Sequence, residues 1–132
     1  MKIDHIGIAV KALAEAARTY ENAFGLKVSS VDQVEEQGVR LVMLDIGESR
    51  LELLEPTRPD SPIGKFLSKR GEGLHHIAVQ VEDIELLLNR LKAAGIRLID
   101  EKPRNGAHHT KVAFIHPSST HGVLVELVEH GK

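Results

Sequence analysis

The chain has 132 residues, of which 42% are hydrophobic and 27% are charged, a balance typical of a globular protein. A net charge of −2 and an aromatic content of 3% argue against a nucleic-acid-binding surface. The sequence has no cysteine, so disulfides and thiolate metal ligands are excluded. No apolar run reaches the roughly 20 residues that span a bilayer, and a predicted strand opens too early to leave room for a signal peptide. We therefore expect a cytoplasmic protein with neither nucleic-acid nor membrane partners.

The first predicted strand covers residues 3–10, and a related strand recurs 71 positions later at residues 74–81. Both are short runs of branched apolar residues, the pattern of a buried strand. The shift places His5 on His76. A histidine is uncommon on such a strand, so its presence in both copies indicates an internal repeat.

The elements that follow these two strands also correspond. In the first copy we expect a helix at about 12–24 that ends at Gly25, a strand at about 26–32, a polar turn, and a hairpin of strands 39–46 and 49–55. In the second copy we expect a helix that is capped by Asp83 and ends at Gly95, then strands at 96–98, 110–116 and 125–129, the last two joined by a longer loop.

A segment between the two copies, about residues 61–70, has no counterpart in either and is predicted to form a linker helix. Ser61 precedes a proline in the first turn, which is typical of a helix start. A chain of this length is one domain by size. We therefore predict a single α+β domain over residues 1–132, in which two β-α-β-β-β modules, about 1–56 and 74–130, form one curved mixed eight-stranded sheet with helices outside.

Each module supplies one histidine early and one glutamate late. His5 is therefore equivalent to His76, and Glu52 to Glu126. Two imidazoles and two carboxylates suit a divalent first-row metal such as Co, Ni, Mn, Zn or Fe. A lone histidine on an apolar strand is more often a hydrogen-bonded core residue than a ligand. The recurrence of both residue types favours the metal, because burying four such groups without one would be costly.

Three nearby residues compete for the same roles. Adjacent strand residues point to opposite faces, so only one of the neighbours His75 and His76 can face the site. The repeat selects His76, and we expect His75 at the surface or beside the site. Glu55 and Glu129 follow Glu52 and Glu126 at odd spacing, so we expect them on the opposite face, in solvent.

The sequence motifs together resemble the vicinal oxygen chelate superfamily, which includes glyoxalase I, extradiol dioxygenases and methylmalonyl-CoA epimerase. Within it the chain looks most like the methylmalonyl-CoA epimerases over nearly its whole length. The stretches that carry the resemblance are residues 3–10, 52–56, 60–63 with Phe66 and Leu67, 73–79, 106–108, and 116–117 with 122–127. The linker helix, the double histidine and the final strand are the most specific of these.

The resemblance implies proton transfer at C2 that interconverts (2R)- and (2S)-methylmalonyl-CoA. It implies one divalent ion per chain, held by His5, Glu52, His76 and Glu126, with cobalt first and Zn, Ni, Mn or Mg as alternatives. Some epimerases carry a glutamate, proposed as a catalytic base, three residues after a Glu-Gln-Gly turn. That position is Leu41 here, so the base roles are assigned to Glu126 and Glu52.

The acyl-CoA substrate carries phosphates that need cations, and the candidates are Lys65, Lys69, Arg70, Arg104 and Lys111. The histidine-rich loop at 104–111 is expected at the site entrance, against the CoA. Exposed strand edges and a small core predict a homodimer. Two alternatives stay open: a glyoxalase I-type lactoylglutathione lyase with the same ligands, and a metal-free ligand-binding protein of the same fold.

Overall fold

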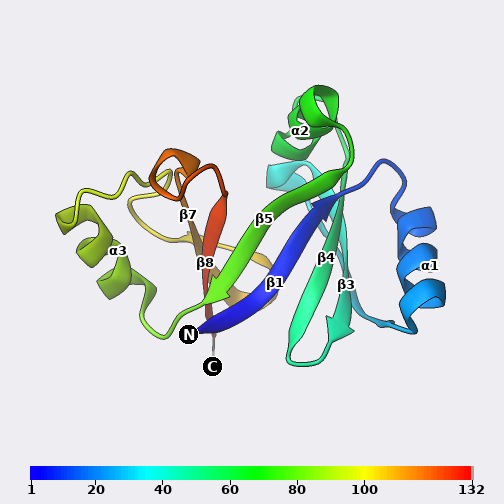
Figure 1. Cartoon of the computed structure of the whole chain (residues 1–132), viewed down its shortest axis with the longest axis horizontal. Helices are drawn as coiled ribbons and strands as arrows, with labels where there is room; N and C mark the ends of the chain where they lie inside the picture. Colours follow the sequence, from blue (N-terminus) through cyan, green and yellow to red (C-terminus); the bar gives the residue numbers. More distant parts are fainter. Residues whose placement is uncertain (132) are drawn as a thin grey trace. The chain divides into compact units, whose positions relative to one another are not determined.

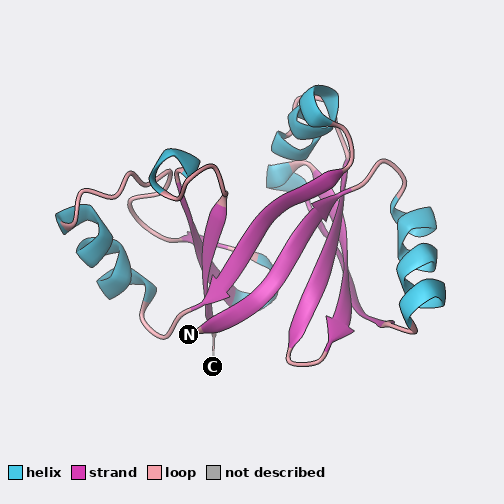
Figure 2. Cartoon of the chain, in the orientation of Figure 1, coloured by secondary structure: helices cyan, strands magenta, loops and turns pink. Residues whose placement is uncertain are grey.

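The computed structural model describes residues 1–131, which form eight β-strands, three α-helices and three short 3-10 helices (Figures 1 and 2). The strands hydrogen-bond in the order β2-β3-β4-β1-β5-β8-β7-β6. This confirms the predicted mixed eight-stranded sheet. The chain divides into an N-terminal unit, His5–His75, and a C-terminal unit, which joins Met1–Asp4 to the residues from His76 onward. The boundary falls inside β1 (Lys2–Ala9) and β5 (Gly73–Gln80), so both strands contribute to both units.

The N-terminal unit follows the predicted β-α-β-β-β order. Its elements are β1, α1 (Leu13–Phe24), β2 (Lys27–Val34), the 3-10 helix η1 (Glu35–Gln37), β3 (Val39–Ile46), β4 (Ser49–Pro56) and α2 (Pro62–Arg70). Strands β2, β3 and β4 pair antiparallel in sequence, whereas β4 pairs parallel with β1. The parallel pair brings the start and the end of the module side by side.

Side chains of alternate strand residues give this unit two apolar faces. Leu13 and Ala17 of α1 pack with Leu44 and Leu53 on one face. Ile63 of α2 packs with Ala9, Val39, Leu41, Met43 and Leu54 on the other. In Figure 1, α1 runs alongside β3 and β4, and α2 lies near their upper ends. The linker helix is therefore confirmed, and it covers the face that also carries His5 and Glu52.

The C-terminal unit repeats this plan. Its elements are β5, α3 (Ile84–Ala93), β6 (Arg104–Asn105), η2 (Ala107–His109), β7 (Thr110–Ile115), η3 (Pro117–Ser119) and β8 (Val125–His130). Strand β5 pairs parallel with β8, and β7 lies antiparallel between β8 and β6. Leu88 of α3 packs with Ala113 and Leu127 on one face. The other face carries the small cluster of Ala78, Val112 and Val128, and within residues 76–131 no helix corresponds to α2.

The strand predicted at 96–98 is wrong. Leu98 makes only an isolated bridge to Ile115, and the two-residue β6 takes the edge of the sheet. Ile96 donates its N–H to Leu91 at the end of α3. The Asp100 carboxylate accepts the N–H of Phe114 at 2.9 Å. The Asp100 side chain thus takes the backbone N–H of β7 that a neighbouring strand would otherwise have bonded.

The starts of the helices confirm the predicted caps and correct the prediction for Glu55 and Glu129. Ser61 accepts the N–H of Gly64, and Asp83 accepts that of Leu86. Glu55 accepts the N–H of Leu13 at 2.9 Å, and Glu129 accepts that of Ile84 at 3.0 Å. Both glutamates are half-buried rather than solvated. Odd spacing did place them opposite Glu52 and Glu126, but that face is where α1 and α3 begin, so the carboxylates cap these helices.

Candidate metal centre

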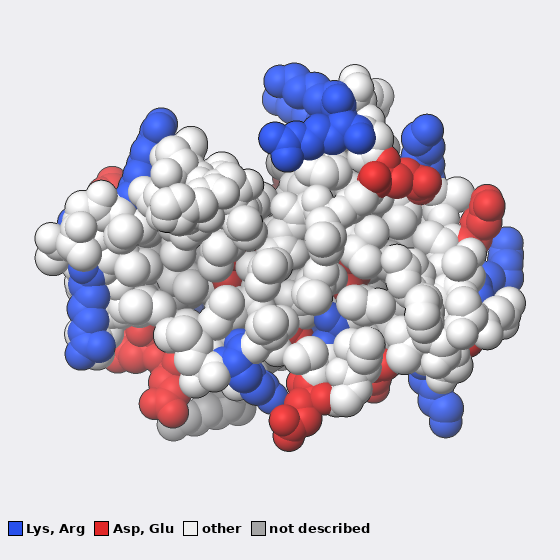
Figure 3. Space-filling view, in the orientation of Figure 1, with Lys and Arg blue, Asp and Glu red and all other residues white. Residues whose placement is uncertain are grey.

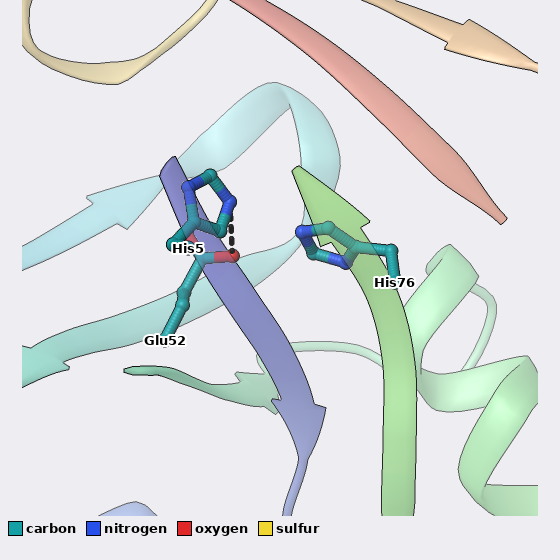
Figure 4. Close-up of side chains that lie close together, drawn as sticks. All are labelled: His5, Glu52 and His76. Carbon is teal, nitrogen blue, oxygen red and sulfur yellow. Dashed lines mark ion pairs between the residues drawn. The ribbon is translucent and has the colours of Figure 1, made fainter. Parts of the chain in front are cut away.

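His5 and Glu52 form a buried pair in the N-terminal unit. In the parallel register of β1 and β4, Gly7 lies opposite Glu52, and His5 shares the face of Gly7 two residues earlier. The Nε2 atom of His5 lies 3.4 Å from Oε1 of Glu52, and Figure 4 marks this pair with a dashed line. The two residues are 5% and 7% exposed, so water contributes little to the solvation of the carboxylate.

His76 and Glu126 form the matching pair in the C-terminal unit. Ala78 lies opposite Glu126 in the register of β5 and β8, and His76 precedes Ala78 by two residues. The Nε2 atom of His76 lies 3.1 Å from Oε1 of Glu126. The two residues are 6% and 8% exposed. The same parallel register, used once in each module, therefore produces both pairs.

Each pair presents an imidazole nitrogen and a carboxylate oxygen in a buried setting. Isolated buried carboxylates are costly and are normally paired or bound to a cation. Nitrogen and oxygen donors of this kind suit a divalent metal. The donor set therefore fits a divalent ion and excludes the soft thiolate sites.

Apolar residues of β3 lie beside the glutamate of the first pair in the sheet. Met43 lies opposite Glu52 in the β3–β4 register, and Leu41 lies opposite Leu54. Leu41 is 3% exposed and belongs to the cluster that packs against α2. The position where some epimerases have a glutamate is thus part of the core here, and it cannot supply a base.

An aromatic ring borders the second pair. Phe114 lies opposite Glu126 in the β7–β8 register, as Met43 lies opposite Glu52. Its ring meets the His76 ring edge-on, with centroids 5.9 Å apart and planes at 79°. The Arg104 guanidinium lies over the Phe114 ring at 5.8 Å and forms an ion pair with Asp100 at 3.1 Å. These contacts had no signal in the sequence, where Phe114 was simply an apolar strand residue.

The candidate substrate cations occupy different elements. Lys65, Lys69 and Arg70 are exposed on α2, where Figure 3 shows basic side chains gathered in the upper part of the view. Arg70 also lies over the Phe66 ring at 5.8 Å. Lys111 is exposed on β7. Arg104, also exposed, already has the intramolecular partners described above.

Of the remaining histidines, two have an unusual backbone conformation and two have side-chain partners. His108 and His109, in the predicted entrance loop, have φ values of 55° and 59°, a left-handed region that few non-glycine residues adopt. His75 is half-buried, and its ring meets Phe66 edge-on at 5.0 Å, so it lies beside α2. His130 pairs with the buried carboxylate of Asp4, a contact that sequence reasoning missed because the two residues lie at opposite ends of the chain.

Comparisons with known proteins agree with this arrangement. The model of the Glyoxalase/Bleomycin resistance protein/Dioxygenase superfamily matches residues 4–114. The mitochondrial methylmalonyl-CoA epimerase of Dictyostelium discoideum is 44% identical over 130 residues, which cover 97% of this chain and 78% of that protein. The ethylmalonyl-CoA/methylmalonyl-CoA epimerase of Cereibacter sphaeroides is 39% identical over 128 residues, 96% of either chain.

The solved structures lead to the same family. A variant of the Streptomyces coelicolor methylmalonyl-CoA epimerase, in complex with 2-nitronate-propionyl-CoA, matches with a TM-score of 0.94 and 42% identity. The match covers 99% of this chain and 95% of that one. Among the described residues, no helix has the length and apolar character needed to cross a membrane. Fold, repeat and near-complete coverage at this identity confirm the resemblance: the chain belongs to the methylmalonyl-CoA epimerase family of the glyoxalase and vicinal oxygen chelate superfamily.

Proposed function

We propose that this protein is an epimerase that interconverts (2R)- and (2S)-methylmalonyl-CoA by proton transfer at C2. The observation that carries the proposal is that His5 with Glu52, and His76 with Glu126, form buried pairs at equivalent positions of the two modules in a chain of this family. The C2 proton lies between a thioester and a carboxylate, so its removal leaves negative charge that must be stabilised. Inversion then requires a proton to leave one face of C2 and another to reach the opposite face.

We further propose that His5, Glu52, His76 and Glu126 together hold one divalent ion per chain, with cobalt as the first candidate and Zn, Ni, Mn or Mg as alternatives. The two modules offer equivalent buried donors, His5 with Glu52 at 3.4 Å and His76 with Glu126 at 3.1 Å, and these are the nitrogen and oxygen ligands that such an ion prefers. When bound, the ion supplies Lewis-acid stabilisation of the charge that develops on the substrate oxygens.

Glu126 and Glu52 are the proposed bases. An internal repeat offers two equivalent carboxylates, which matches a reaction that needs a proton acceptor for either configuration of C2. Leu41 is apolar and buried, so no third carboxylate comes from that position. Each proposed base lies within 3.4 Å of a histidine of its own module, and this contact holds the carboxylate in place.

The CoA portion is proposed to contact the cations of α2, namely Lys65, Lys69 and Arg70, and Lys111 of β7. These side chains are exposed and can therefore reach a bound ligand. The placement of the loop 104–111 at the site entrance stays a prediction. So does the homodimer, which sedimentation would test against the 14.5 kDa monomer, and so does the cytoplasmic location.

The two alternative functions are not favoured by the comparisons, in which the relatives described above are named as epimerases. A lactoylglutathione lyase would use the same ligand types but would act on a glutathione hemithioacetal. A metal-free binding protein would not need two buried His/Glu pairs at equivalent positions.

Isotope exchange tests the proposed function directly. The cobalt-loaded protein is incubated with (2R)-methylmalonyl-CoA in deuterated water, and the C2 position of both epimers is followed by NMR. We expect deuterium at C2 and formation of the 2S epimer. The hemithioacetal of methylglyoxal and glutathione serves as the competing substrate. Turnover of the hemithioacetal without label at C2 of methylmalonyl-CoA would contradict the proposal.

A further inference from the structure

The His76 side chain contacts Phe114, and Phe114 in turn contacts Asp100 and Arg104, all within the C-terminal unit. Phe114 lies edge-on to the His76 ring, with 5.9 Å between centroids. Such an edge-on contact is a favourable geometry for two aromatic rings, and it restricts how far either ring can rotate. Phe114 is also the register partner of Glu126. One side chain therefore stands next to both members of this His/Glu pair.

The Asp100 side chain holds the backbone of Phe114. The Oδ2 atom of Asp100 accepts the N–H of Phe114 at 2.9 Å. The carbonyl of Phe114 in turn accepts the N–H of Ile99 at 2.9 Å. The Asp100 side chain is 14% exposed, so solvent competes little for its carboxylate. The backbone on either side of Phe114 is thereby tied to the segment that follows α3.

Arg104 holds the ring of the same residue. Its Nε lies 3.1 Å from Oδ1 of Asp100, and its second terminal nitrogen lies 3.4 Å from Oδ2. This two-point contact orients the planar guanidinium. The oriented guanidinium lies over the Phe114 ring at 5.8 Å, within the range of a cation–π interaction. One carboxylate thus positions both the backbone and the covering cation of Phe114.

We propose that Asp100 and Arg104 are positioning residues that act through Phe114 to hold the His76 imidazole in the orientation it needs as a metal ligand. The inference rests on the proposed function, because it takes His76 as a ligand. It assigns Arg104 a role different from phosphate binding. The arrangement is particular to the C-terminal module, since the repeat-equivalent register partner of Glu52 is Met43, which has no ring.

Metal affinity and the spectrum of the bound metal test this role without any substrate. Cobalt affinity is measured by competition with a chelator, and the visible absorption of bound Co(II) reports the geometry of its ligands. We expect Phe114→Leu and Arg104→Ala each to weaken cobalt binding by about tenfold, as loss of an outer contact to a histidine ligand does, and to change the absorption bands. Arg90→Ala, an exposed position on α3, is the matched control and should leave both readouts unchanged.

Arg104→Lys separates positioning from phosphate binding, because lysine keeps the charge but loses the planar fork. Positioning predicts that Arg104→Lys resembles Arg104→Ala in cobalt affinity, whereas KM for the CoA ester changes little in both. Phosphate binding predicts a raised KM in Arg104→Ala, recovery in Arg104→Lys, and wild-type cobalt binding in both, and that result would overturn the inference. If Phe114→Leu fails to fold by circular dichroism, the two variants at exposed Arg104 decide the question.

The failure of the proposed function would look different. A wild-type protein that binds cobalt but does not exchange the C2 proton would remove the epimerase assignment, while altered spectra in the variants would still support the positioning role. A wild-type protein that binds no divalent metal would overturn both.

Discussion

Replacing the two histidines one at a time tests whether the two His/Glu pairs share a single metal ion. His5 and His76 come from equivalent strands, and each faces a glutamate of its own module. If four ligands hold one ion, then His5→Ala and His76→Ala should each abolish tight binding, because either variant leaves an incomplete set. If each pair bound its own ion, either variant would keep half of the metal.

The expected effect on stability follows from ligand linkage. Free metal at about 100 times its dissociation constant stabilises a one-site protein by about 2.7 kcal/mol. The entropy of unfolding is about 2.1 cal/mol/K per residue. A chain of 132 residues therefore unfolds with an entropy of about 0.28 kcal/mol/K, and the wild-type melting temperature should rise by about 10 °C. Neither histidine variant should show this rise.

Two measurements decide the outcome: metal content by elemental analysis after gel filtration, and the melting temperature with and without cobalt. The matched control is His121→Asn, since His121 is exposed and asparagine tolerates its backbone φ of 59°. One ion per wild-type chain and none in either variant is the expected result. Full occupancy in His76→Ala, or half of a two-ion stoichiometry in each variant, would refute the shared site.

Two further predictions concern the glutamate caps and the basic helix. Glu55→Ala should destabilise the protein by about 1–2 kcal/mol in urea denaturation, and Glu129→Ala by less, because α3 keeps the second cap from Asp83, whereas the N-cap residue of α1 is Ala12, which has no capping side chain. Equal losses would contradict this difference. Lys65→Ala combined with Lys69→Ala should raise KM for the CoA ester at low salt and leave kcat unchanged, with Lys92→Ala as control. An unchanged KM would remove α2 from the substrate site.

The repeat made most of the site predictable from the sequence. The period-two pattern of two related strands identified His5 and His76, and the late strands identified Glu52 and Glu126. A parallel pairing of the first and last strand of each module then brings histidine and glutamate together, because both registers offset the histidine by two residues from the partner of the glutamate. Strand periodicity and repeat symmetry depend on many residues, so an atypical residue at one position does not hide them.

The parts that could not be predicted depend on single side chains. The spacing of Glu55 and Glu129 gave the correct face of the sheet, but only the packed helices show that this face carries N–H donors for the carboxylates. The prediction of a strand at 96–98 is wrong because the Asp100 carboxylate accepts the N–H of Phe114. A side-chain hydrogen bond of this kind leaves no periodic pattern in the sequence. The edge-on contact of Phe114 with His76 is equally invisible, since an aromatic residue in a strand does not reveal its ring partner.

Glu126→Gln tests the proposed division of the two bases. Glutamine keeps an oxygen that can face the metal and His76, but it cannot accept the C2 proton. Losing a positioned base should reduce turnover by about a hundredfold or more. If Glu52 serves the other configuration of C2, the variant should still exchange the C2 proton of one epimer with deuterated water, without inverting it. Elemental analysis must show that the metal is retained, and Glu52→Gln should show the complementary preference. Near wild-type turnover in Glu126→Gln would refute the two-glutamate mechanism, and the second proton would then have to come from another side chain or from water.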